Sequence, residues 1–317
     1  MVKSDFETFY NNINHAKIEE EWGKIKIQHK NKRQKAIITI LVLDIIVISF
    51  LYVFFRNMIS EMFSIRYSFS LLMVLAFDVF VYAVITSDSY VKYNKLYKEE
   101  IVEDLLKNFF DEVDYIPNKE MPENIYNECK QYERYDNYYS DDYMEGTIDN
   151  KYSIKMADVK TEEERTERNS NGKLESETYT LFSGLFATIY MKKSIKGELV
   201  IKENNTILKK ERLEMDSEEF EKLFDVSASD KIKGMQLLTH DIMDLLITFR
   251  KQWNIPYDIV INNNIMYIRL HTGDMFESRY SNKKVIKEEI TRKYYNTVDF
   301  IYSLTKEMIE NVEQTQL

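Results

Sequence analysis

Two long apolar stretches stand out in the first third of the chain. Residues 36–55 hold fifteen Ile, Leu, Val or Phe residues in twenty positions, and residues 68–86 hold eleven in nineteen. As helices, both are long enough to cross about 30 Å of hydrocarbon. Polar sequence precedes the first stretch, which is not typical of a cleaved signal peptide. We therefore predict a two-span transmembrane helical hairpin, made of residues 36–55 and 68–86, with a short external loop at residues 56–67.

Positive charge flanks the hairpin at its two ends. The residues are Lys30, Lys32, Arg33 and Lys35 before the first span and Lys92, Lys95 and Lys98 after the second. The connecting loop has only two arginines. Because basic residues favour the cytoplasmic side, we expect a multi-pass protein of the cell membrane whose N-terminus and C-terminal domain are both cytoplasmic. The lipid bilayer is then its first partner.

Each predicted span contains one aspartate, Asp44 or Asp78. Asp44 lies eight residues after the first span begins and Asp78 eight residues before the second ends. In an antiparallel hairpin both would lie about 12 Å below the cytoplasmic surface. We expect an intramembrane polar pair that shares a proton and joins the helices, within one hairpin or between copies of the chain. A proton or cation path in an oligomer is the alternative.

Helical spacing of apolar residues continues on both sides of the hairpin. Residues 1–35 are predicted to form a cytoplasmic amphipathic helix, with Ser4 and Glu7 at the spacing of a capping box. Residues 87–122 are predicted to form a cytoplasmic stalk helix that ends near Pro117 and Pro122.

Beyond residue 122 the pattern changes to short segments rich in β-branched and aromatic residues. Strands are predicted from about residue 143 to residue 210, with the polar run at 160–175 as an exposed loop or hairpin tip. Helices are expected after caps at Asp216 and Thr239, a hairpin is expected to turn at residues 262–264, and a long helix should end the chain. Residues 123–317 are therefore predicted to form a cytoplasmic α+β domain with an antiparallel sheet and flanking helices.

Several of these segments together resemble a known family. They are "YKEEIVEDLL", "SDDYMEGTI", "FSGLFATIYMKKSIKGELVI", "EEFEKLFDVSASDKIKGMQLLTHDIMDLL", "IMYIRL" and "DMFE". Their order is similar to that of the bacterial membrane family named domain of unknown function 3137, over roughly residues 97–317. His240 stands where the resemblance implies proline, which affects the start of that helix. The family name supplies no activity, so the resemblance implies architecture only.

Charge and composition narrow the partners. The net charge is −10; residues 1–35 carry +3 and residues 36–86 carry −1, so residues 87–317 carry −12. An acidic surface of this size repels phosphate backbones, so we expect no nucleic-acid partner. The single cysteine, Cys129, excludes an internal disulfide and a CxxC site.

The sequence contains few signatures of catalysis or of a cofactor. No two of its glycines are spaced as a GxGxxG, Walker A or GxSxG motif requires, and we expect no cofactor. Weak candidate metal ligands are His271, Asp274 and Glu277 after the last strand, and Asp141, Asp142 and Glu145 before the first. A run of tyrosines is either a recognition surface or a satellite core; its members are Tyr126, Tyr132, Tyr135, Tyr138, Tyr139 and Tyr143.

These observations favour a membrane-tethered cytoplasmic module that binds or scaffolds a partner. The partner would be a cytoplasmic protein or a small ligand, and further copies of the chain are a third option. The alternatives are a metal-dependent enzyme in the cytoplasmic domain and an oligomeric membrane protein that conducts ions or protons. The absence of catalytic motifs argues against an enzyme.

Overall fold

The computed structural model describes residues 3–55, 63–168, 173–195, 197–204, 212–277 and 287–314, with side chains except at 51–72, 88, 90, 167 and 175. The chain divides into two compact units. A helical unit is built on residues 13–100, and an α+β unit is built on residues 1–12, 101–277 and 287–317.

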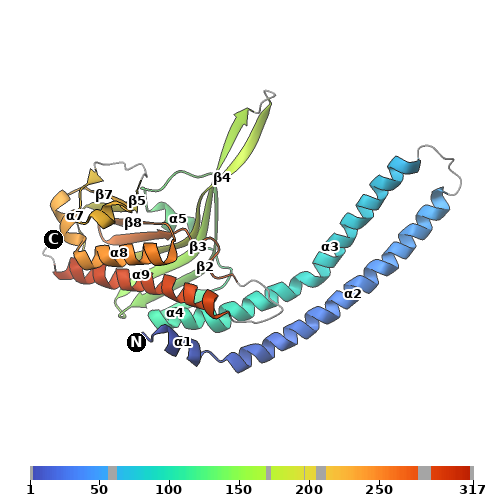
Figure 1. Cartoon of the computed structure of the whole chain (residues 1–317), viewed down its shortest axis with the longest axis horizontal. Coiled ribbons are helices and arrows are strands. Elements are labelled where there is room, and N and C mark those ends of the chain that lie inside the picture. The colour runs from blue at the N-terminus through green and yellow to red at the C-terminus, as the bar shows by residue number, and fades with distance from the viewer. Residues whose placement is uncertain are drawn as a thin grey trace. The chain divides into compact units, whose positions relative to one another are not determined.

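The helical unit is a pair of long helices that run side by side (Figure 1). They are α2 (His15–Phe55) and α3 (Phe63–Tyr97), and the π-helical turn η1 (Lys98–Val102) follows. The helix α2 passes through residue 35, where the sequence predicted a boundary. Of the expected external loop, residues 56–62 lie outside the described residues and the rest is helical. Within the described part of the chain, one helix, Met73–Phe109, is long and apolar enough to cross a membrane.

The α+β unit is organised around a single nine-stranded antiparallel sheet, which confirms the predicted fold class. Its strand order is β1-β2-β3-β4-β9-β8-β5-β7-β6. The strands are β1 (Asp111–Ile116), β2 (Asn137–Ile148), β3 (Tyr152–Arg168), β4 (Leu174–Tyr190), β5 (Glu198–Glu203), β6 (Arg212–Leu213), β7 (Phe224–Ala228), β8 (Tyr257–Asn262) and β9 (Ile265–Leu270). A turn was predicted at residues 262–264. In the structure Asn263 and Asn264 form the β8–β9 turn, Asn262 is the last residue of β8, and Asn263 has the positive φ of +54° that a tight turn requires.

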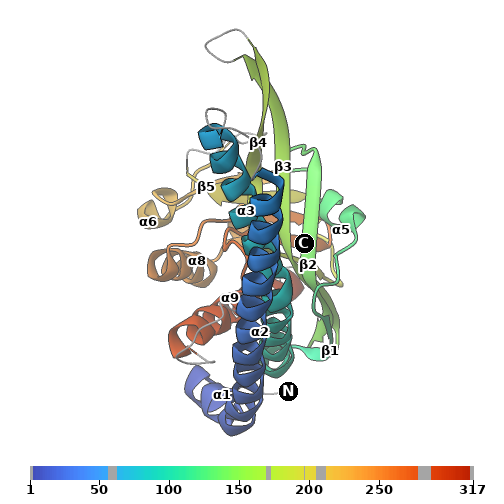
Figure 2. The same ribbon diagram turned by 90° about the vertical axis from the view of Figure 1, so that its right-hand side faces the viewer.

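Helices cover both faces of this sheet (Figure 2). One face carries α8 (His240–Trp253) and α9 (Glu288–Gln314), where Phe249 stacks on Phe300 with ring centroids 3.8 Å apart. The opposite face carries α5 (Glu123–Asn127) and the chain that follows it. Strands β8 and β9 are consequently buried on both sides. The remaining helices are α1 (Phe6–Asn12), α4 (Glu103–Phe109), α6 (Glu218–Glu221) and α7 (Lys231–Leu237).

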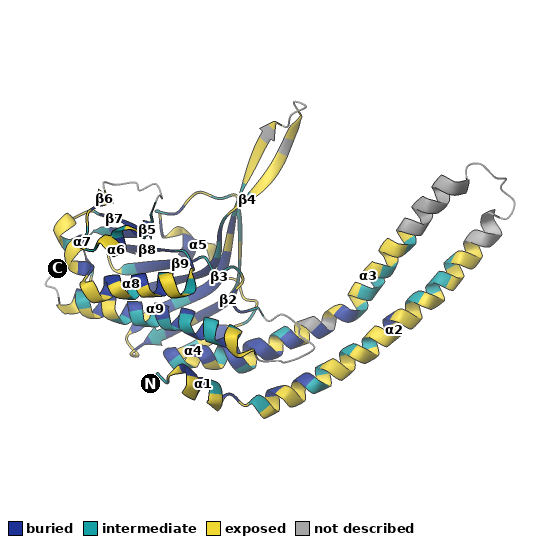
Figure 3. Ribbon diagram, viewed as in Figure 1, coloured by how far each residue is buried: buried dark blue, intermediate teal, exposed yellow. Residues whose placement is uncertain are grey.

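Strands β3 and β4 extend beyond the sheet as a two-stranded arm (Figure 1). In the arm, residues 162–168 of β3 pair with residues 174–180 of β4, and β2 stops pairing at Glu162. Most arm residues with described side chains are exposed (Figure 3). The polar run at 160–175, predicted to be an exposed loop or a hairpin tip, lies mostly in these paired strands, and residues 169–172 lie outside the described residues.

The first residues of the chain belong to the α+β unit. In α1, Phe6 packs edge-on against Tyr295 of α9, and Arg292 of α9 lies over the Phe6 ring and bonds Glu7 at 2.7 Å. The Tyr295 hydroxyl donates to the carbonyl of Ser4. Residues 3–12 therefore form a strap against α9, which is separated from α2 by a break at residues 13–14.

Three local predictions are corrected by the structure. Residues 111–116, expected in the stalk, form the edge strand β1, because pairing with β2 satisfies the backbone there and the helix already ends at Phe109. The cap of α1 is Asp5, whose carboxylate accepts the Thr8 amide at 2.9 Å, while Ser4 contacts Asn108. The cap of α6 is Ser217 and not Asp216.

Gly184 allows β4 to approach the end of β9. Its φ is +154°, and a Cβ at this position would lie 2.0 Å from the carbonyl oxygen of Leu270. A side chain there would collide with backbone that cannot move away. Glycine is therefore required at position 184, where β4 meets the end of β9.

Candidate functional site

The predicted ligands His271, Asp274 and Glu277 have separate surroundings. The His271 Nε2 atom lies 3.8 Å from the Asp258 carboxylate, and its ring meets Phe182 edge-on. Asp274 is exposed, and the carbonyl of Glu277 accepts the Tyr294 hydroxyl at 3.0 Å. Among the described residues, these three do not form a group whose ligand atoms could hold one metal ion.

A different acidic group is assembled from β2 and β3. Asp141, Asp142 and Asp158 each place a possible ligand atom within 4.8 Å of the others. Asp141 and Asp142 were predicted as candidate ligands together with Glu145. Glu145 instead accepts the Tyr143 hydroxyl and lies 3.6 Å from Lys155. We call Asp141, Asp142 and Asp158 the aspartate cluster.

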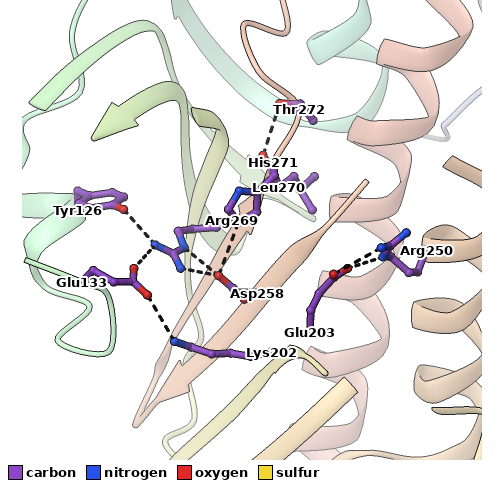
Figure 4. Close-up of polar contacts among 10 residues, drawn as sticks. All are labelled: Tyr126, Glu133, Lys202, Glu203, Arg250, Asp258, Arg269, Leu270, His271 and Thr272. Atoms are coloured by element: carbon purple, nitrogen blue, oxygen red, sulfur yellow. Dashed lines mark hydrogen bonds and ion pairs between the residues drawn. The ribbon is translucent and has the colours of Figure 1, made fainter. Parts of the chain in front are cut away.

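A second polar group lies on the α5 face, around Arg269 of β9 (Figure 4). The Arg269 side chain is 4% exposed and binds Asp258 on β8 through two nitrogens, at 3.1 and 2.5 Å. Its third nitrogen lies 3.0 Å from a carboxylate oxygen of Glu133 and 3.4 Å from the Tyr126 hydroxyl. A buried guanidinium is thus fixed by partners from both β8 and the segment after α5.

Aromatic rings enclose the same guanidinium. Its central carbon lies 3.9 Å from the ring centroid of Tyr132 and 5.2 Å from that of Phe182. Since a ring face attracts a cation most strongly away from water, both rings stabilise the charge. The tyrosine run is accordingly a satellite core: Tyr126, Tyr132 and Tyr143 are buried, with Tyr135 and Tyr138 packed against the cluster. Tyr139 is the exception, at 53% exposed.

The network around Arg269 is electrically balanced and reaches solvent at its edge. Lys202 on β5 is 7% exposed and lies 3.9 Å from Glu133, which is 46% exposed. Two cations therefore face two carboxylates, with His271 beside Asp258 (Figure 4). We call Arg269, Asp258, Glu133 and Lys202 the arginine clamp, since its contacts join α5 and its following segment to the sheet.

The clamp controls the ionisation of Asp258. Burial alone would raise the pKa of this carboxyl group, but the interaction with His271 and the charge of Arg269 outweigh burial and hold the pKa at about 2. Asp258 is therefore an anion across the physiological range. Its Oδ2 atom accepts both hydrogen bonds from Arg269, so the clamp acts as a structural fastening and not as an acid or base.

The clamp was not predicted from the sequence, although the hairpin contains one signal for it. The turn was expected at residues 262–264, but the observed two-residue turn at Asn263 and Asn264 pairs Asp258 with Arg269 across the hairpin. Opposite charges in facing positions of apolar strands indicate a buried ion pair. The contribution of Glu133 had no comparable signal, because it comes from an irregular segment.

Asp44 and Asp78 both lie on the side of their helix that faces the other helix. Half-buried positions recur every three or four residues and mark this seam; they are Ile40, Leu43, Asp44 and Val47 in α2 and Val74, Asp78, Val81, Tyr82 and Ile85 in α3. Asp44 and Asp78 therefore lie on the facing sides of their helices, and a hydrogen-bonded pair between them stays a prediction.

Comparison with known proteins gives a family match over part of the chain. Residues 180–309 match the model of the family described as "Protein of unknown function (DUF3137)". No curated protein matches the chain. The crystal structure of the mycobacterial trehalose monomycolate transport factor A, TtfA, covers 68% of this chain and 96% of its own, with 9% identity and a TM-score of 0.37. A similarity at that level carries no functional argument.

Replacement of Arg269 by methionine tests the clamp. The variant buries Asp258 without its main cation, and we expect a loss of about 3–5 kcal/mol at pH 8. In the wild type the folded-state pKa of Asp258 is depressed to about 2, so its stabilisation is complete above the unfolded value of about 3.9 and is lost as pH falls toward 2. In the variant the contribution of Arg269 is lost while burial and the interaction with His271 remain, so the folded-state pKa of Asp258 should rise, and the stability lost at low pH in the wild type should be smaller.

Thermal unfolding of the detergent-solubilised protein at several pH values measures both effects. Arg250→Met is the matched control, because Arg250 pairs with Glu203 where the side chains are 20% and 28% exposed (Figure 4). It should cost about 1 kcal/mol or less, with an unchanged pH profile. Parallel profiles for Arg269→Met and the wild type would contradict this account of Asp258.

Proposed function

We propose that the protein is a membrane-tethered module that binds or scaffolds a cytoplasmic partner. In this proposal α2 and α3 cross the bilayer as a hairpin, and both ends of the chain and the α+β unit face the cytoplasm. The unit presents a surface to a protein or small ligand. The α+β fold and the matched family domain are compatible with this proposal, but neither identifies a partner.

The proposed membrane tether rests on the outward face of the helix pair. Large apolar side chains there are 43–70% exposed, and exposed positions run along both helices (Figure 3), while Asp44 and Asp78 are half-buried. They are Ile37, Ile38, Leu41, Val42, Ile45, Ile46, Ile48, Phe50, Met73, Leu75, Phe77, Val79, Phe80 and Val84. An apolar surface of this extent is not stable in water and fits a hydrocarbon environment. The lysines at the two ends of the pair support the orientation.

Cysteine labelling of intact cells tests the orientation. A cysteine at position 60 should react with an impermeant maleimide, and one at position 170 should react only after the membrane is opened. The native Cys129 gives little background, because burial raises the pKa of its thiol to about 11. Reaction at position 170 but not at position 60 would reject the proposed topology.

We further propose that Asp44 and Asp78 join the two helices as a hydrogen-bonded pair within the membrane. Their placement in the seam supports this role. A single replacement by leucine leaves the other carboxyl group without a partner, and we expect each to cost up to about 2 kcal/mol. The double leucine variant should recover much of that loss, because both polar groups are removed together.

Thermal unfolding of the two single variants and the double variant in detergent measures the coupling. Asparagine replacements serve as the control and should preserve stability, since an amide still donates to the remaining carboxyl group. Strictly additive losses in the leucine variants would show that the two side chains do not interact.

We propose that the β3–β4 arm is the element that binds a partner. Beyond Glu164, which contacts Asp136 and Asn137, the described backbone of β3 and β4 in the arm is paired between these two strands, and an isolated two-stranded hairpin contributes little to stability. Residues 162–168 and 173–180 hold six glutamates against three basic residues, a net charge of −3. An exposed, acidic projection of this kind suits a partner with a basic surface.

Deletion of the arm tests its role. Residues 163–179 are replaced by Asn-Gly, which can join the paired residues Glu162 and Thr180 in a two-residue turn. We expect nearly unchanged thermal stability and loss of the proteins that the wild type retains in affinity capture from its native cells. Glu163→Lys with Glu164→Lys keeps the arm and should also lose a basic partner. An unchanged set of retained proteins after deletion would exclude the arm as the binding element.

A further inference from the structure

The aspartate cluster has a geometry that ordinary strand pairing does not give. Asp141 and Asp158 face each other across β2 and β3, and the register shifts immediately after Asp141. Adjacent residues of a regular strand point to opposite faces, but a bulge changes this alternation. Asp142 lies in the bulge with φ of +55°, which lets neighbouring carboxylates approach Asp158 together.

Two of the three carboxyl groups are removed from water. Asp142 is 1% exposed and Asp158 is 4% exposed, while Asp141 is half-buried. Asp142 is held in place, because its Oδ1 atom accepts the Tyr115 hydroxyl at 3.0 Å. Burial and then repulsion by Asp142 raise the pKa of Asp158. As a set of anions the cluster is unfavourable, so it needs protons or a cation.

The oxygen atoms of Asp158 have different surroundings. Its Oδ2 atom accepts the backbone amides of Met275 and Phe276, at 3.0 and 3.3 Å. Its Oδ1 atom is buried and, within the described part of the protein, accepts no hydrogen bond. A buried carboxylate oxygen without a donor is costly, and the carboxylate that carries it lies within 4.8 Å of two further carboxylates, as a metal ligand would.

We propose that Asp141, Asp142 and Asp158 bind one divalent cation of the oxygen-preferring class, Ca²⁺, Mg²⁺ or Mn²⁺. Three carboxylates and no nitrogen or sulfur ligand match the preference of these ions. The ion replaces the repulsion among the three carboxylates by attraction, and Asp158 Oδ1 is one of its ligands. It also fixes the β2 bulge to the loop of Met275 and Phe276, because Oδ2 of the same carboxylate holds that loop. The role is structural and does not depend on the proposed tether.

The test uses the full-length detergent-solubilised protein after removal of bound metal with a chelator. Ca²⁺, Mg²⁺ or Mn²⁺ is then added, the unfolding temperature is measured, and bound Mn²⁺ is counted by electron paramagnetic resonance. We expect one Mn²⁺ per chain and a higher unfolding temperature with at least one of these ions. Asp158→Asn should weaken Mn²⁺ binding by at least about tenfold and remove the thermal response. Without metal it should unfold no earlier than the wild type, since repulsion is relieved.

Asp274→Asn is the matched control, because Asp274 is exposed and lies outside the cluster. It should bind Mn²⁺ as the wild type does. Asp141→Asn, at the half-buried position, provides a second ligand variant if Asp158→Asn does not fold, and should also weaken binding. Absence of binding by the wild type overturns the proposal. So does equal binding by the cluster variants, or loss of binding in Asp274→Asn alone, which would place the ion at the loop after β9.

Discussion

The ion pair between Arg269 and Asp258 is the interaction on which the centre of the α+β unit depends. It lies on the two central strands that helices cover from both sides, where an unpaired charge would be strongly unfavourable. Because Arg269 and Asp258 pair across the β8–β9 hairpin, both charged side chains can be buried on the sheet face that α5 covers. Glu133, Tyr126 and Tyr132 then fasten the irregular chain after α5 to that face, and the tyrosine core forms around it.

Predictions from sequence were accurate where a local period determines the structure. The α+β class, the antiparallel sheet and the final helix follow from patterns of two or of three to four residues, and the β8–β9 turn was predicted to within one residue. Predictions failed where a distant partner decides. Residues 111–116 have a helical repeat but pair with β2, and no local signal places the bulge that brings Asp142 beside Asp158. The three ligands expected after β9 are close together in the sequence, but the loop that carries them does not bring their side chains together in space.

The two units solve the burial of polar groups in different ways. In the α+β unit, charges on the sheet are paired with charges of opposite sign beneath aromatic rings. In the helix pair, the polar side chains Asp44 and Asp78 lie in the seam, and apolar side chains are presented outward. The first arrangement suits a protein core bounded by water, and the second suits a hydrocarbon solvent. One sequence thus contains two opposite hydrophobic patterns, separated near residue 100.

The strap of residues 3–12 makes the helix pair an insertion within the α+β unit. Phe6 contacts Tyr295, which lies 289 residues later in the chain. At a translation rate of about 5–20 residues per second, roughly a quarter of a minute to a minute separates their synthesis. Both long helices are synthesised during that interval, before Phe6 can meet its partner on α9. The contact between the strap and α9 therefore forms only after the helix pair has been made.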